Sequence, residues 1–177
     1  MSLKILAVIV GLVFYSGVSL AECILPENPY GERPFKLNLS ESECALVRYT
    51  GGHIVTISVN YPDMKIVSPR IFDRALITFR LLYVPGVLRN QGGSIAGKKP
   101  ISVIGGVELY DFGSSFIRRF LGADGSPVLV VDGPYTYIAT RLFNNDIQVL
   151  YQYSLVNGDL MVIDDFALDF LKKIIRK

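Results

Sequence analysis

The last third of the chain consists of short apolar segments separated by residues that favour turns. The segments are 128–131, 135–143, 147–156 and 160–163, and the residues between them are Asp132-Gly133-Pro134, Asn144-Asn145-Asp146 and Asn157-Gly158. Asn-Gly is a strong hairpin signal, because both residues tolerate the positive φ angles of a tight two-residue turn. The pattern predicts an antiparallel meander of four strands in the carboxyl-terminal third.

Pairing Phe143 with Ile147 sets the register of one hairpin in this meander. Ala139 then lies opposite Tyr151. One face of the sheet carries four tyrosines, Tyr135, Tyr137, Tyr151 and Tyr153, with Tyr137 opposite Tyr153. Such a face is a candidate binding surface, because tyrosine combines a large contact area with a polar tip. The alternative is that the tyrosines pack beneath a helix as part of the core.

The chain ends in a segment with the periodicity of an amphipathic helix. Its apolar stripe is Ala167, Phe170, Leu171 and Ile174. Asp164 or Asp165 is expected to cap the first turn, because a carboxylate accepts hydrogen bonds from free amides there. A helix that must cover one face of an antiparallel sheet predicts an α+β fold.

The segments before residue 128 carry weaker signals. Strands are expected at 44–49, 53–61, 101–104 and 107–112, with the odd positions of 53–61 facing the core. Residues 114–121 are a candidate helix of two turns. Residues 77–83 alternate as a strand does, although a helix over 70–82 is the alternative reading. We expect a mainly antiparallel sheet built by one domain, residues 22–177.

The first 21 residues have the layout of a cleavable signal peptide. Lys4 precedes an uncharged apolar run, and Ser19 and Ala21 provide small residues before a cleavage site at Glu22. An uncleaved membrane anchor is the alternative, since the run approaches the length of a spanning helix. If the leader is cleaved, the protein contacts the membrane only transiently, through the leader during export. We therefore expect a periplasmic or secreted protein.

Both cysteines, Cys23 and Cys44, lie after this leader. Exported proteins mature where thiols oxidise, so we expect a disulfide between them. The bridge would hold an extended, proline-rich arm, residues 22–43, against the domain. The spacing does not match the Cys-x-x-Cys motif of a redox pair.

The longest irregular stretch is residues 85–100, which contains four glycines and three basic residues, Arg89, Lys98 and Lys99. Long loops in a compact domain often carry function, and a rigid sheet can present such a loop to a partner. We therefore count these three residues, with the four tyrosines, as candidate partner-binding residues. Basic groups there would attract an acidic partner.

Several classes of function lack support in the sequence. Without the leader the chain carries 17 Lys and Arg against 16 Asp and Glu, so nothing calls for a nucleic-acid partner. The chain contains one histidine, and its acidic residues do not have the spacing of a calcium-binding loop. We therefore expect no metal or other cofactor. Hydrolase motifs are missing, although Glu108, Asp111, Asp164 and Asp165 could supply a carboxylate pair.

These observations predict a small exported binding or inhibitor protein that acts on a protein partner in the cell envelope. An immunity protein that blocks a toxin in the periplasm is one example. The sequence leans away from an enzyme and assigns no catalytic residue. A carboxylate-dependent envelope hydrolase and a structural envelope component are the alternatives. A binder should present an exposed aromatic patch or a protruding loop, whereas an enzyme should gather titratable groups in a pocket.

Overall fold

A computed structural model describes residues 22–26, 34–50, 53–69, 73–84, 95–154, 156 and 158–175 of the chain. The predicted leader therefore lies outside the described residues. Among the described residues, no helix is both long and apolar enough to cross a membrane. The elements are β1 (Glu22–Ile24), β2 (Lys36–Asn38), α1 (Glu41–Cys44), β3 (Arg48–Thr50), β4 (Ile54–Asn60), β5 (Lys65–Val67), β6 (Leu76–Tyr83), β7 (Ser102–Ile104), β8 (Val107–Asp111), β9 (Phe116–Leu121), β10 (Pro127–Asp132), β11 (Thr136–Phe143), β12 (Ile147–Ser154) and α2 (Leu160–Ile174).

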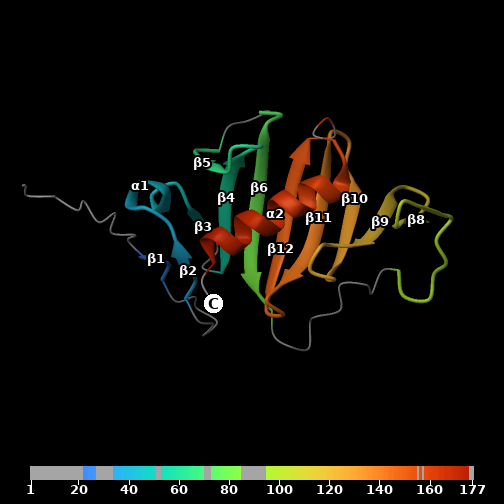
Figure 1. Ribbon diagram of the computed structural model, residues 1–177, viewed down its shortest axis with the longest axis horizontal. Coiled ribbons are helices and arrows are strands. Elements are labelled where there is room, and N and C mark those ends of the chain that lie inside the picture. The colour runs from blue at the N-terminus through green and yellow to red at the C-terminus, as the bar shows by residue number, and fades with distance from the viewer. Residues whose placement is uncertain are drawn as a thin grey trace, which may run out of the picture.

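Ten of these strands form one antiparallel sheet, in the order β3-β4-β6-β12-β11-β10-β9-β8-β7, with β5 paired to the edge of β4. Strands β7 to β12 follow one another along the sheet as a meander. The meander joins the amino-terminal half through β12 and β6, which lie side by side (Figure 1). The expected α+β class, a mainly antiparallel sheet with a carboxyl-terminal helix, is confirmed.

The predicted register of the β11–β12 hairpin is confirmed. Phe143 pairs with Ile147, Ala139 with Tyr151, and Tyr137 with Tyr153. The odd positions of β4 are also buried as expected, because Val55, Ile57 and Val59 are fully enclosed. Side chains alternate between the two faces of a strand, so one correct pair places all the others.

The expected fourth strand of the meander, 160–163, is wrong, because α2 begins at Leu160. Asp159 is its cap and accepts a hydrogen bond from the Met161 amide at 2.7 Å, so neither Asp164 nor Asp165 caps the helix. The buried residues Ile163, Phe166, Ala167, Phe170, Leu171 and Ile174 follow helical spacing through the whole segment. The Asn157-Gly158 pair therefore precedes a helix rather than closing a hairpin.

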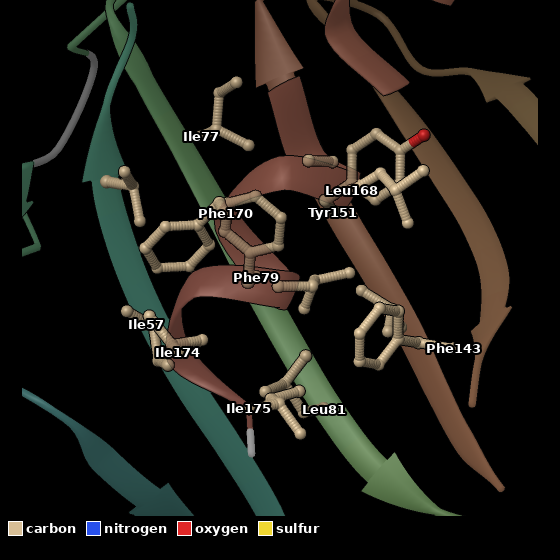
Figure 2. Packing of buried hydrophobic residues seen from close by; sticks show 14 of the residues in the cluster. Ile57, Ile77, Phe79, Leu81, Phe143, Tyr151, Leu168, Phe170, Ile174 and Ile175 are labelled. Atoms are coloured by element: carbon tan, nitrogen blue, oxygen red, sulfur yellow. The ribbon is translucent and has the colours of Figure 1, made fainter. Parts of the chain in front are cut away.

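Helix α2 crosses one face of the sheet, in front of the central strands (Figure 1). The rings of Phe170 on the helix and Phe79 on β6 lie 4.9 Å apart, and both side chains are buried. Figure 2 shows Ile57, Ile174 and Leu81 among the side chains packed between helix and sheet. Burying a large apolar side chain of this kind contributes about 1.5–3 kcal/mol, so α2 anchors the fold.

Two local expectations are corrected. Residues 116–121 form strand β9 rather than a helix, because both their edges pair with neighbouring strands. The strand expected at 44–49 is shorter and later, β3 at Arg48–Thr50, because the short helix α1 (Glu41–Cys44) and a turn precede it. Ser40 and Glu43 form a reciprocal capping box at α1, a local signal that favours helix. Residues 76–83 form a strand, β6, as the alternation indicated.

The amino-terminal arm pairs its own two strands and is tied to the domain by a disulfide and by a bridge to the end of α2. Cys23 and Cys44 form the expected disulfide, with Cα atoms 5.7 Å apart. Strand β1 pairs with β2, and Leu37 of β2 forms an isolated bridge with Ile175 after α2. The arm thus packs beside the end of α2 (Figure 1).

Candidate functional site

The two faces of the sheet differ in what covers them. In β12 the residues alternate without exception: Ile147, Val149, Tyr151 and Tyr153 are buried under α2, whereas Gln148, Leu150, Gln152 and Ser154 are partly exposed. We call the surface formed by the second set and its cross-strand neighbours the open face. Helix α2 lies on the opposite side, so it does not cover the open face.

Strand pairing places a continuous row of side chains across the open face. The row is Thr56, Arg80, Leu150, Thr140, Leu129, Arg119 and Glu108, from β4 to β8. A second row contains Thr78, Gln152, Ile138 and Val131. Ile138 and Val131 are 37% and 36% exposed. Aliphatic and polar side chains therefore alternate on a surface that stays accessible.

Two arginines on the open face differ in their partners. Arg119 donates to Glu108 at 2.9 Å, and the hydroxyl of Tyr110 donates to the same carboxylate oxygen at 2.8 Å. These hydrogen bonds lower the pKa of Glu108. Arg80 is exposed and forms no ion pair with any described residue. Among the residues that the structure describes, no ion pair therefore offsets the positive charge of Arg80.

Part of the predicted binding loop lies beside the open face. Ile95 packs with Tyr110 and Ile117, whose side chains point to this side of the sheet. The Nζ atom of Lys98 lies 3.6 Å from the ring centroid of Phe112, and Lys99 is exposed. Lys98 thus borders the open face. The third basic candidate, Arg89, lies outside the described residues.

The four candidate tyrosines separate into two groups. Tyr151 and Tyr153 are 1% and 2% exposed, because α2 covers their face, so they belong to the core and are withdrawn as binding residues. Tyr137 is partly buried on that same face, with its ring 5.5 Å from the ring of Tyr153. Tyr135 is 83% exposed at the turn before β11.

Tyr135 borders a pocket of about 750 Å³ at one end of the open face. The polar residues that line it come from the loop before β6 (Asp73, Arg74), from β6 (Thr78), from β11 (Thr136) and from β12 (Gln152, Ser154). We call it the Tyr135 pocket. Its lining combines these polar side chains with apolar surface from Leu76, Pro134 and the two tyrosines, Tyr135 and Tyr153.

A buried charged cluster lies on the other side of the sheet, under α2. Arg141 contacts Asp164 at 2.6 Å and Asp124 at 2.5 Å, and Tyr151 donates its hydroxyl hydrogen to Asp164 at 2.6 Å. Burial raises the pKa of Asp164, against the opposing effect of Tyr151 and Arg141. Burial, together with the charge of Asp164, also raises the pKa of the Tyr151 hydroxyl. Because Arg141 and Asp164 are fully buried, a ligand cannot reach either of them directly.

The carboxylates considered for hydrolase chemistry do not converge. Glu108 is paired with Arg119 on the open face, whereas Asp164 lies under α2. Asp111 accepts a hydrogen bond from the Gly113 amide at 2.6 Å, in a turn. Among the described residues there is also no group of three or more histidine, cysteine or acidic side chains placed to hold a metal ion.

Comparisons of the chain with protein-family models, curated proteins and solved structures found no match. The function must therefore be argued from the surface itself.

Two arginines, Arg141 and Arg80, were not predicted as important from the sequence, although it contains signals for them. Arg141 lies between Ala139 and Phe143 in β11, so the register that buried Ala139 also placed Arg141 in the core. A buried arginine requires an acidic partner, which Asp164 provides. Arg80 could be placed on the open face only after β6 was paired with β12, a contact between segments far apart in the chain.

Proposed function

We propose that this chain is a small exported binding protein, of the inhibitor type, whose open face binds a protein partner in the cell envelope. One observation carries the proposal: side chains on the open face remain partly exposed in the same strands whose other side chains are fully buried. Large exposed surfaces with aliphatic side chains commonly mark interaction sites.

The charges on this face favour an acidic partner. Arg80 lies on β6, within the sheet, without an ion pair among the described residues, and Lys98 borders the same face while Lys99, its neighbour in the chain, is exposed. Helix α2, on the opposite side, carries exposed residues of both signs, Asp165 and Asp169 together with Lys172 and Lys173. Positive charge on a binding face increases the association rate with an acidic protein and makes that rate fall with salt.

Export is the second part of the proposal. The disulfide between Cys23 and Cys44 fits a protein that matures in an oxidising compartment. The apolar leader with its Ser-x-Ala ending supports cleavage before Glu22. The intact mass of the exported protein tests this part, and a species that retains residues 1–21 would contradict it.

Site-specific photo-crosslinking in the producing cell tests the binding face. A photoreactive phenylalanine analogue replaces Gln148 on the open face in one variant and Asp169 on α2 in the control variant. We expect a discrete protein adduct from position 148, which weakens when Arg80→Glu is added. Adducts of equal yield from both positions, or none from position 148, would overturn the proposal.

A further inference from the structure

We propose that the Tyr135 pocket binds a saccharide, a function beyond the recognition of a protein partner. A sugar ring presents hydroxyl groups that both donate and accept hydrogen bonds, and it presents faces formed by C–H groups. A site for it therefore needs several fixed side chains of mixed donor and acceptor character, together with an accessible aromatic ring. The Tyr135 pocket contains both.

The polar floor of the pocket is built on three adjacent strands. Thr78 on β6 lies directly opposite Gln152 on β12, and Thr136 on β11 lies opposite Ser154. The amide nitrogen of Gln152 donates to the hydroxyl oxygen of Thr136 at 3.0 Å. This bond orients the Gln152 side chain, so that its carbonyl oxygen can accept from a sugar hydroxyl while the Thr136 hydroxyl donates to another.

The aromatic rim is held by a tight turn. The amide of Gly133 donates to the carbonyl oxygen of Thr136 at 2.7 Å, which closes the turn that presents Tyr135. A Cβ atom at position 133 would lie 2.9 Å from that oxygen, so glycine is required there. A ring that is 83% exposed contributes little to the core, so it stays accessible to a ligand that enters the pocket.

The charges of the pocket favour a neutral ligand. Asp73 and Arg74 are adjacent, so their charges offset each other. One carboxylate oxygen of Asp73 accepts from the Ala75 amide at 3.0 Å, which fixes the carboxylate while its second oxygen can accept from sugar hydroxyls. A phosphate site would need a surplus of basic groups, and a cation site would need more acidic ones. The volume lies in the range of small-molecule sites, about 300–1,000 Å³.

Titration of the isotope-labelled protein with chitotetraose, cellotetraose and maltotetraose, followed by amide NMR shifts, tests the proposal. We expect at least one of these probes to shift the amides of Tyr135, Thr136, Gln152 and Ser154. Inorganic phosphate serves as the competing probe. A response to phosphate alone, or no response to any of the three oligosaccharides, would overturn the proposal.

Three variants sharpen the test. Tyr135→Ala removes the ring and should weaken binding about tenfold or more, whereas Tyr135→Phe keeps the ring and should bind nearly as well. Phe116→Ala is the matched control, because Phe116 is also an exposed aromatic residue but lies away from the pocket, on β9. Equal losses in Tyr135→Ala and Phe116→Ala would contradict the assignment. For each variant, an amide spectrum that is unchanged away from the substituted position verifies that the protein is folded.

Discussion

Arg141 of β11 and Asp164 of α2 form an ion pair in which both side chains are fully buried. One guanidinium nitrogen of Arg141 donates to both carboxylate oxygens of Asp164, at 2.7 and 2.6 Å. Gly122 makes room for this contact, since a Cβ atom there would lie 2.5 Å from Asp164 Oδ2. The pair therefore fixes the position of α2 on the sheet, in addition to the apolar contacts.

Asp164→Ala should lower the free energy of unfolding by about 3–5 kcal/mol, because it removes the buried partner of Arg141 and leaves only the partly exposed Asp124 to pair with its charge. Urea unfolding measures the effect. Asp165→Ala is the control, as Asp165 is exposed on the same helix. Equal urea midpoints for the two variants would show that the ion pair does not hold α2.

Phe170→Ala should lower the free energy of unfolding by about 3–5 kcal/mol, and Ile174→Ala by about 2–5 kcal/mol. Both side chains are 1% exposed between α2 and the sheet. Lys173→Ala, an exposed change in the same helix turn, should have little effect. An unchanged denaturant midpoint in both core variants would contradict the docked helix.

Replacing both cysteines, Cys23→Ser with Cys44→Ser, should lower the free energy of unfolding by about 3 kcal/mol in the chain-entropy model. The bridge closes a loop between residues 21 positions apart, so its loss frees the unfolded chain. Alkylation of the unreduced, denatured protein checks the bridge independently. Uptake of two alkyl groups without a reductant would count against it.

Stability should fall as the pH is lowered below about 4.5. Hydrogen bonds from Ser40 lower the pKa of Glu43, and hydrogen bonds from Arg119 and Tyr110 lower that of Glu108. A carboxyl group with a lowered pKa in the folded state stabilises that state above its unfolded pKa. The contribution is lost as the pH falls through the folded pKa.

Urea midpoints measured across acidic pH values test this expectation. Glu108→Gln removes one of the responsible groups, so the midpoint of this variant should decline less steeply with acid. The raised pKa of Asp164 acts in the opposite direction, because its contribution is lost as the pH rises through the folded pKa. An equal decline in the variant and the parent protein would refute the role of Glu108.

Local signals in the sequence were sufficient for the parts of the fold that neighbours along the chain control. The Asn144-Asn145-Asp146 turn and the alternation around it predicted the pairing of Phe143 with Ile147 correctly. The apolar stripe of α2 and the disulfide of Cys23 with Cys44 were also predictable. In each case the determining residues are close in sequence, or there is only one possible partner.

Only the tertiary structure decided the features that depend on distant partners. Residues 116–121 are a strand because β8 and β10 pair with both edges, which outweighs a short segment's own preference. The pairing of β6 with β12 joined Arg80 to Leu150 and so created the open face and its pocket. Tyr151 and Tyr153 became core because α2 docks on their face and not on the other. The local sequence would allow the amphipathic helix to cover either face of the sheet. The buried contact of Arg141 with Asp164 forms only when α2 lies on the face that carries Arg141.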